Sequence, residues 1–381
     1  MIRRLPLPLL CAAALLGPAA LAAQSGQFVV RLGNDTLAIE QYTRTADRLQ
    51  GEQVVRSPRT VHRIYTASFG AGGALERFEL VSHNVSGGPG PQESRSTVEF
   101  RGDSAIVTRP RGDGTLTERV KVGAGALPYI NQGWGLVEEV ARRARAAGGD
   151  HYTTAMLQLG NDEPWTVELS RVGSDSMTIL LGPLGLLRMR VDAQGTLLGL
   201  TGIGSTMQVT VQRVQGLDFA GMGKAFAPRS LGSLSPGDSV KATVAGAAVA
   251  VRYSRPSARG RVIFGGVVPW NQVWRTGANA ATVLETDADL IVAGTRLPAG
   301  KYSLWTIPAP SGWKLIVNRN TGQWGTDYDA QYDFARLDMK VEPLTRPVEQ
   351  FTIAIEPRGK GGGVLALEWE RTRASIPFSR K

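Results

Sequence analysis

The sequence predicts a mainly β protein with two domains. Short segments that alternate apolar and polar residues recur along most of the chain, which is typical of half-buried strands. Gly-Asp turns and glycine-rich loops separate these segments, and a single stretch has helical spacing instead. We therefore expect an N-terminal antiparallel meander with one packed helix over residues 24–215. A C-terminal β-sandwich or jelly-roll-like domain is expected over residues 239–381.

Residues 1–23 have the pattern of a signal peptide. Arg3 and Arg4 form a charged start, an apolar run follows, and small residues precede a cleavage site near Ala22-Ala23. The apolar run is too short to span a bilayer, and no later segment approaches the roughly 20 apolar residues that a membrane span needs. We expect a soluble protein that is periplasmic or secreted, without a transmembrane segment.

Cysteine content and charge narrow the class of protein. Cys11 is the only cysteine and lies in the signal peptide, so the mature chain depends on its hydrophobic core rather than on disulfides. The formal net charge is +10, and most of the excess lies in residues 216–381. A basic exported domain suits an anionic envelope ligand, although an arginine-rich source genome explains the same charge. The basic residues are too dispersed to indicate nucleic-acid binding.

The predicted strands of the N-terminal domain fall on either side of its helix. Before the helix, residues 27–122 alternate strands with turns at Gly102-Asp103 and Gly112-Asp113. After it, further strand patterns start at Trp165, Met177, Leu186, Leu197 and Met207. A lone amphipathic helix must bury its apolar stripe against a sheet, so we expect a curved sheet around it or packed on it.

The helix itself is expected over residues 131–147. Asn131 is a suitable N-cap. Pairs at i,i+4 spacing are expected on its solvent-exposed face: Glu138–Arg142 and Glu139–Arg143. Its apolar face comprises Ile130, Trp134, Val137, Val140, Ala141 and Ala144.

Residues 216–238 are rich in Gly, Ser and Pro with little periodicity, which predicts an inter-domain linker. Beyond it, loops over residues 298–300 and 359–363 are expected to close hairpins. The strand patterns of this half cover residues 244–253 (two strands), 261–264, 282–286, 290–292, 301–307, 313–318, 349–355 and 364–370.

Several motifs of this second half, in this order, resemble the domain-of-unknown-function 2911 family. They are Tyr253-Ser-Arg-Pro, Gly260-Arg-Val-Ile-Phe-Gly265, Val273-Trp-Arg-Thr-Gly-Ala-Asn279, Leu297-Pro-Ala-Gly-Lys-Tyr-Ser-Leu304, Trp313-Lys-Leu-Ile-Val-Asn318 and Gln323-Trp-Gly325. The resemblance covers about residues 233–381 and implies an exported bacterial protein with a β-sandwich-like domain. It implies no activity, because none is established for the family. The N-terminal domain shows no comparable resemblance.

The stretch over residues 270–282 has an unusual composition and is the strongest candidate for a binding surface. Trp faces stack on sugars or apolar groups, Arg binds a carboxylate or phosphate, and Asn reads hydroxyls. The candidate ligand-binding residues are Trp270, Trp274, Arg275, Asn279, Trp305, Asn318 and Trp324. The alternative is structural: the Trp residues fill the core, while Arg275 and Asn279 hold a loop through backbone carbonyls.

Catalytic patterns are weak in this sequence. The histidines, His62, His83 and His151, all lie in the first domain, so a Ser-His-Asp triad cannot be built within the second. A weaker alternative is a metal-dependent hydrolase with Asp327, Asp329 and Asp333 as ligands, although these residues lack the spacing of an EF-hand loop and suit a solvated turn.

The leading expectation is an exported, non-enzymatic binding or envelope-associated protein. Its ligand would be a glycan or a lipid-derived molecule, and no cofactor, catalytic residue or nucleic acid is expected. A third interpretation is a structural module that docks a partner. The sequence leaves the ligand, the oligomeric state and the orientation of the two domains open.

Overall fold

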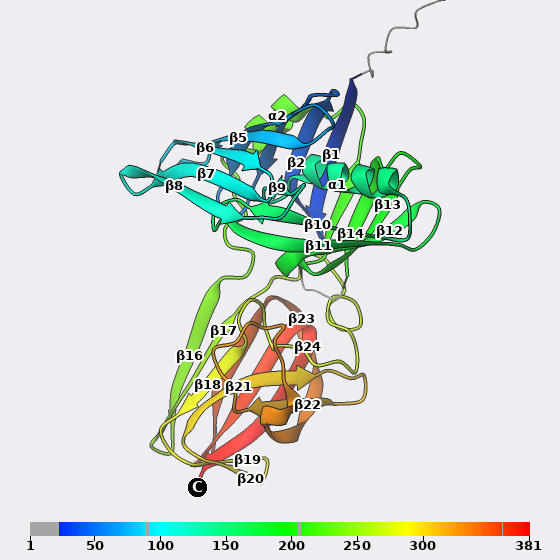
Figure 1. Cartoon of the computed structure of the whole chain (residues 1–381). Coiled ribbons are helices and arrows are strands. Elements are labelled where there is room, and N and C mark those ends of the chain that lie inside the picture. Colours follow the sequence, from blue (N-terminus) through cyan, green and yellow to red (C-terminus); the bar gives the residue numbers. More distant parts are fainter. Residues whose placement is uncertain (1–22, 88–90, 204–206, 360) are drawn as a thin grey trace, which may run out of the picture.

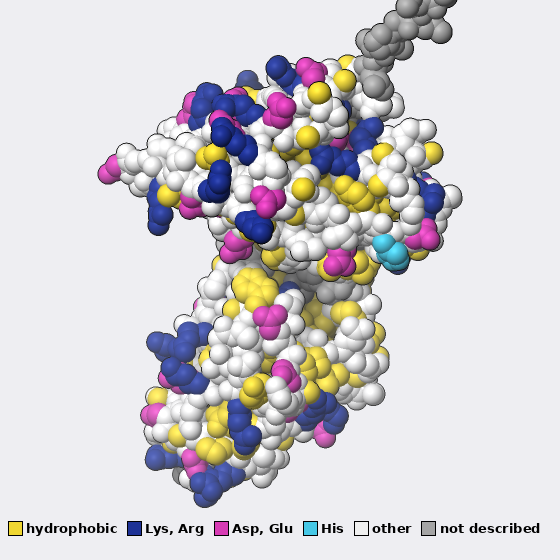
Figure 2. Space-filling view, viewed as in Figure 1, with side chains coloured by type: hydrophobic (Ala, Val, Ile, Leu, Met, Phe, Trp, Pro, Cys, Tyr) yellow, Lys and Arg dark blue, Asp and Glu magenta, His cyan; other side chains and the backbone are white. Residues whose placement is uncertain are grey.

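The computed structural model describes residues 23–87, 91–203, 207–359 and 361–381. The expected signal peptide therefore lies outside the described residues except for Ala23. The described chain is mainly β and forms two β domains (Figure 1), and the space-filling view shows a narrower waist where they meet (Figure 2). Among the described residues, no helix has both the length and the apolar character that crossing a bilayer requires.

The N-terminal domain is a single highly curved sheet. Its order is β8-β7-β6-β5-β4-β3-β2-β1-β15-β14-β13-β12-β11-β10-β9, and every pairing is antiparallel except that of β9 with β10. The expected hairpin turns after Arg101 and Arg111 are present. The strands are β1 (Gln24–Leu32), β2 (Asp35–Arg44), β3 (Arg48–Val55), β4 (Val61–Phe69), β5 (Leu75–Asn84), β6 (Glu93–Arg101), β7 (Ser104–Arg111), β8 (Gly114–Lys121), β9 (Leu127–Tyr129), β10 (His151–Gln158), β11 (Glu163–Arg171), β12 (Ser176–Leu181), β13 (Leu186–Val191), β14 (Leu197–Gly202) and β15 (Val209–Arg213).

Helix α1 (Trp134–Ala147) packs against the inner face of this sheet (Figure 1). Trp134, Leu136, Val137 and Val140 are fully buried in one cluster with side chains from both halves of the meander. The sheet thus curves around the helix, because this apolar stripe has no other surface to cover it.

The start of α1 differs from the prediction. The helix begins at Trp134 rather than at residue 131, and its N-cap, Gly133, makes no side-chain cap bond. The carboxylate of Glu40, on β2, accepts the backbone N–H of Trp134 at 2.7 Å and that of Gly135 at 3.3 Å. A residue far away in sequence thus caps the helix, so Asn131 does not have the predicted role.

The predicted ion pairs of α1 are present, but not on an exposed face. Glu138 lies 2.5 Å from Arg142, and Glu139 lies 3.5 Å from Arg143. The Glu138 side chain is only 1% exposed, because the facing sheet covers it with polar side chains of its own. Amphipathic periodicity does not distinguish a solvent-exposed polar face from one that meets buried polar partners.

The segment predicted to be a linker contains a second helix, α2 (Phe219–Phe226), capped by the side chain of Asp218. Phe219 packs on Val29, Ile39 and Val54, which point out of the opposite face of the sheet from α1. Two turns are too short to give a clear helical period, so the sequence pattern did not reveal this helix.

The C-terminal domain contains a nine-stranded arrangement with the order β16-β17-β18-β21-β22-β23-β24-β19-β20. The long hairpin β23–β24 bends at register shifts and thereby contributes to both layers of the sandwich. The strands are β16 (Gly237–Val244), β17 (Ala247–Ser254), β18 (Thr282–Thr286), β19 (Leu290–Val292), β20 (Thr295–Leu297), β21 (Gly300–Ile307), β22 (Trp313–Asn318), β23 (Asp333–Arg358) and β24 (Gly362–Arg380).

Two local predictions for this domain are wrong. Residues 261–264 form a loop rather than a strand. Residues 298–300 do not close a hairpin, because β20 pairs with β19 whereas β21 pairs with β18 and β22. An apolar run indicates a buried segment but not that the segment is a strand. A Pro-Ala-Gly turn indicates a reversal of the chain but not that the flanking strands pair with each other.

Candidate binding cleft between the two domains

The stretch over residues 270–282 has a tightly constrained backbone. Asn271, Thr276 and Asn279 have positive φ angles of 61°, 53° and 59°, a region that costs non-glycine residues energy. The surrounding structure enforces this conformation: Thr276 is fully buried, and its carbonyl accepts a hydrogen bond from the Thr282 hydroxyl at 2.7 Å. The unusual composition of this stretch therefore serves a rigid loop.

Some of the candidate ligand-binding residues lie in the domain core. Trp274 is 7% exposed and stacks on Trp369 at 5.9 Å between ring centroids. Trp305 is 2% exposed and donates its indole N–H to the Ser303 hydroxyl at 2.9 Å. Trp270 is half-buried and stacks on the core residue Phe264. These Trp side chains hold the sandwich together and do not line a common surface.

Asn318 and the three aspartates form a structural turn. Asn318 is 1% exposed and donates to the Asp329 carbonyl and to the Asp333 carboxylate, both at 2.9 Å. Asp333 also accepts hydrogen bonds from Tyr328 and Arg336. Asp329 caps a short 3₁₀ helix, η2 (Ala330–Tyr332), and Asp327 accepts from the Thr326 hydroxyl. Within the described ranges, no three His, Cys, Asp or Glu side chains are grouped closely enough to hold a metal ion.

The other candidates meet in a cleft between the two domains. Arg275, Asn279 and Trp324 all line a cavity of about 830 Å³ at the waist of the molecule. The loop with Trp324 is fastened to the 270–282 stretch, since the Gly325 N–H donates to the Asn279 carbonyl at 3.0 Å. A side chain at Gly325 would collide with the Arg275 stem, so close packing sets the place of this arginine. The sequence candidates thus divide into a core group and a cleft group.

The N-terminal domain supplies an apolar wall to the cleft. The wall lies at the short helix η1 (Gly182–Leu184) and the edges of the strands around it. Leu186 is 43% exposed and Trp324, across the cleft, is 48% exposed, both high for large apolar side chains. The apolar wall of the cleft comprises Leu32, Pro58, Pro183, Leu184, Leu186, Ile203, Met207 and Leu234.

The C-terminal domain supplies three arginines to the same cleft, Arg259, Arg261 and Arg275. Arg261 donates to the carbonyls of Ala258 and Ser257 at 3.0 and 2.7 Å, which fixes its guanidinium. Burial, and then the nearby charge of Arg259, lower the pKa of Arg261 to about 10. Burial also lowers the pKa of Arg275. The described lining holds no Asp, Glu, His or Cys, so its charge is positive.

One turn joins the domains beside the cleft. The Asn34 N–H, in the β1–β2 turn, donates to the Arg259 carbonyl at 2.8 Å, and Arg259 forms an ion pair with Asp35. Gly33 and Gly260 allow this approach, because a Cβ on either would meet the other domain at 2.1 Å. This contact positions one of the arginines of the cleft.

Sequence reasoning missed Arg259, Arg261 and the apolar wall. Arg261 lies in a motif quoted for the family resemblance, which was the one available signal. The wall could not be found from the sequence, because its residues come from strand ends that only the arrangement of the domains brings to the waist.

The C-terminal part of the chain matches a known protein family. Residues 235–378 match DUF2911, a protein family of unknown function. This confirms the resemblance of the C-terminal half and includes the three arginines of the cleft. The N-terminal domain has no family match.

Two solved structures have partial similarity to this chain. A DUF1089 family protein from Pseudomonas aeruginosa is 16% identical, with 44% of this chain covering 90% of that chain and a TM-score of 0.33. A beta-barrel-like protein of the domain of unknown function DUF1849 from Brucella abortus is 12% identical, with 50% and 94% covered and a TM-score of 0.35. In a comparison with curated proteins, none matches this chain.

Proposed function

We propose that this is an exported, non-enzymatic binding protein whose ligand is a lipid-derived amphiphile with an acidic head. The observation that carries the proposal is the cleft itself. One domain contributes an apolar wall and the other contributes three arginines, with no acidic side chain in the described lining. The signal-peptide pattern of residues 1–23 supports export, and the basic C-terminal half suits an anionic envelope ligand.

The arginines favour an anionic head group. A buried guanidinium keeps its charge at a desolvation cost, which is the reason that the pKa of Arg261 and that of Arg275 are lowered. A carboxylate or phosphate beside either guanidinium would add charge-assisted, bidentate hydrogen bonds. The head group therefore belongs on the C-terminal side of the cleft.

The opposite wall favours an apolar tail. Leu184, Leu186 and Met207 offer no hydrogen bonds, and covering them removes apolar surface from water at about 25 cal/mol per Å². The cleft volume of about 830 Å³ lies within the range of small-molecule sites, about 300–1,000 Å³. Binding rather than catalysis is proposed because the described lining offers no acid, base or thiol to a reaction.

Titration with three matched probes tests the proposal. Lysophosphatidic acid has the acidic head and the tail, lysophosphatidylcholine has a head of zero net charge, and glycerol phosphate has no tail. Trp324 lines the cleft, so its fluorescence should report binding. We expect lysophosphatidic acid to bind most tightly and glycerol phosphate to give no measurable signal below millimolar concentration.

Arginine variants connect binding to this cleft. Arg275→Ala and Arg261→Ala should each weaken lysophosphatidic acid binding by roughly tenfold or more, as expected for loss of a charge-assisted hydrogen bond. Arg252→Ala removes an exposed arginine on β17 and is the matched control. If both cleft variants bind like the wild type, the site is wrong. Binding of a protein partner alone would favour the docking-module interpretation instead.

A further inference from the structure

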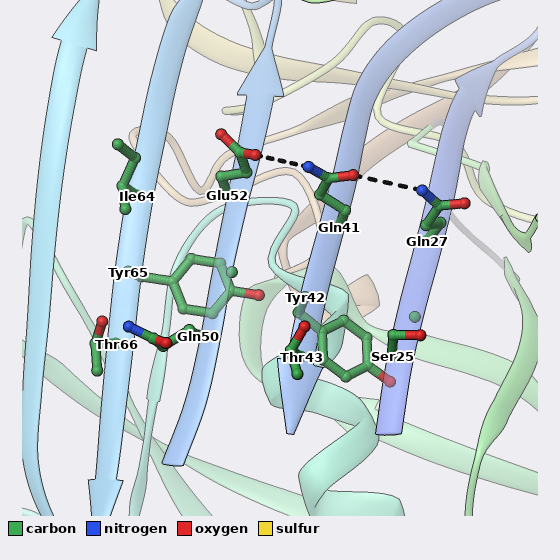
Figure 3. A pocket seen from close by; sticks show the side chains of 12 residues that line it. Ser25, Gln27, Gln41, Tyr42, Thr43, Gln50, Glu52, Ile64, Tyr65 and Thr66 are labelled. Atoms are coloured by element: carbon green, nitrogen blue, oxygen red, sulfur yellow. Dashed lines mark hydrogen bonds between the residues drawn. The ribbon is translucent and has the colours of Figure 1, made fainter. Parts of the chain in front are cut away.

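A second hollow, separate from the cleft, lies on the outer face of the N-terminal domain. Its volume is about 540 Å³, and strands β1 to β4 form its floor (Figure 3). Helix α2 covers the apolar part of the same face, over Val29, Ile39 and Val54. The hollow is the continuation of that face beyond the helix, and there the side chains change from apolar to polar.

The polar side chains of the hollow form two rungs that cross the strands. Cross-strand pairing places Gln27, Gln41, Glu52 and Ile64 in one rung. The other rung lies two residues away on each strand, where the same pairing aligns Ser25, Thr43, Gln50 and Thr66. Neighbouring members of a rung are therefore about 4.8 Å apart, the spacing of strands in a sheet.

The first rung is held in one hydrogen-bonded orientation. Gln27 donates its amide to Gln41 at 3.4 Å, and Gln41 donates to Glu52 at 2.6 Å (Figure 3). This row of hydrogen bonds is anchored at both ends. The Leu217 N–H donates to Gln27 at 3.0 Å, and His62 lies 2.8 Å from the other Glu52 oxygen. The amide orientations are thus set before any ligand arrives, which reduces the entropy cost of binding.

The row between the two rungs makes the floor rigid. Gly26, Tyr42, Gly51 and Tyr65 pair across the strands, and the tyrosine hydroxyls donate to buried carboxylates inside the domain. Each ring lies under a neighbouring glycine, where a Cβ would come within 2.2 or 2.3 Å of it. The rings therefore leave no room for the floor to shift toward the core.

We propose that this hollow binds an extended, neutral polysaccharide that lies across the strands. The lining consists mainly of amides and hydroxyls, with the single carboxylate Glu52 and no Lys or Arg among its described residues. Such groups donate to and accept from sugar hydroxyls, whereas they provide no positive charge to pair with a phosphate or sulfate. In a chain of net charge +10, a lining whose one charged side chain is acidic disfavours anions.

The two rungs also indicate the shape of the ligand. A sugar ring is comparable in length to the strand spacing, so successive residues of an extended chain would each meet a new pair of side chains. Ile64 is 44% exposed at the end of the first rung and offers an apolar contact for the face of one ring. A peptide is disfavoured, because β1 to β4 have neighbours on both sides and leave no free edge for an added strand.

Calorimetric titration with cello- and chito-oligosaccharides of increasing length tests the inference on the full chain. Affinity should rise with each added sugar and level off once the ligand spans the four strands. Gln41→Ala and Thr43→Val, one from each rung, should each weaken binding roughly fivefold. Gln212→Ala, at an exposed position of β15, is the matched control.

Some outcomes would overturn the inference and others would support it. It is wrong if none of these oligosaccharides binds a folded protein at millimolar concentration, if only acidic oligosaccharides bind, or if both rung variants bind like the wild type. The rung variants should keep wild-type circular dichroism and wild-type lysophosphatidic acid binding. That last measurement separates the hollow from the cleft, so either proposal can fail alone.

Discussion

The two domains are both β structures, but they fill their interiors differently. The N-terminal domain buries charge: Glu138 accepts from Tyr42, Arg142 and Arg213, and from the Leu197 N–H at 3.0 Å. The C-terminal domain buries aromatic rings: Phe264 and Phe351 each contact both Trp274 and Trp369, which stack on one another. The helix inside the sheet presents carboxylates to the interior, whereas the buried polar side chains of the C-terminal domain, among the described residues, are the uncharged groups of Thr, Ser and Asn.

This difference predicts different weaknesses. A buried carboxylate must keep every partner, because an uncompensated charge is expensive in a protein interior. An aromatic cluster contains no group that must stay charged, and it loses stability mainly when a truncated side chain leaves a cavity. The joining contact beside the cleft is small, so we expect the two domains to unfold in separate transitions that can be compared within one molecule.

The largest effect should come from Trp369→Ala. Trp369 is fully buried and contacts three other rings, so its removal should cost the C-terminal domain about 4 kcal/mol. Guanidinium unfolding followed by fluorescence and circular dichroism measures this loss. Trp324→Ala, a half-exposed residue of the same domain, should cost less than about 1 kcal/mol. Equal losses would mean that the aromatic cluster is not the centre of this core.

Glu138→Gln should have the next largest effect, and on the other domain. It removes the charge between Arg142 and Arg213, and about 3 kcal/mol of stability should be lost from the N-terminal transition alone. Glu285→Gln, which removes an exposed partner of Arg252, should leave the stability of both domains unchanged within the error of the measurement. A shift of the C-terminal transition in Glu138→Gln would contradict the comparison.

The stability of the N-terminal domain should depend on pH because of Glu40. Burial raises the pKa of this carboxyl from 4.5 to about 7, against the opposing hydrogen bonds from Tyr65 and the start of α1. The folded domain therefore holds a proton that the unfolded chain releases, so its stability should fall between pH 4.5 and 7 and level off above. The slope should be at most about 1.4 kcal/mol per pH unit.

A variant isolates this contribution. Glu40→Gln keeps an acceptor for the helix amides but cannot titrate, so the difference between its stability and that of the wild type should vary with pH over this window. Urea unfolding at a series of pH values measures it. A constant difference would show that Glu40 does not hold the proton.

The smallest effect is expected where the domains meet. Asp35→Asn removes the partner of Arg259, a partly exposed pair, and the domain that unfolds first should lose less than about 1 kcal/mol. Asp238→Asn removes a similar pair with Arg255 within the C-terminal domain and serves as control. A single merged transition in the wild type would show that the joining contact is stronger than this pair implies.

Much of the fold followed from sequence patterns. Alternation, Gly-Asp turns and helical spacing are local signals. The first two predicted the hairpins after Arg101 and Arg111, and the third predicted the helix in the meander. What they missed depends on distant partners. The cap of α1 comes from Glu40, and the packing of Phe219 depends on a sheet face formed long before it in the chain.

The candidate site was predictable only in part. Unusual composition pointed to residues 270–282, but the same residue types serve cores and ligands, and Trp274 and Trp305 serve the core. Arg275, Asn279 and Trp324 do line the cleft. The apolar wall opposite them and the two rungs of the outer hollow arise from strand register, which periodicity alone does not determine.

The pairing of β1 with β15 has a consequence for the order in which the chain folds. Nearly all other pairings in the N-terminal domain join consecutive strands, but Phe28 must find Arg213, almost the whole length of the domain away. Closing so long a loop is entropically costly and slow compared with forming hairpins. Two half-sheets should form early, and joining them at this seam completes the core around α1. The same step brings the Leu217 N–H to Gln27, at one end of the outer hollow.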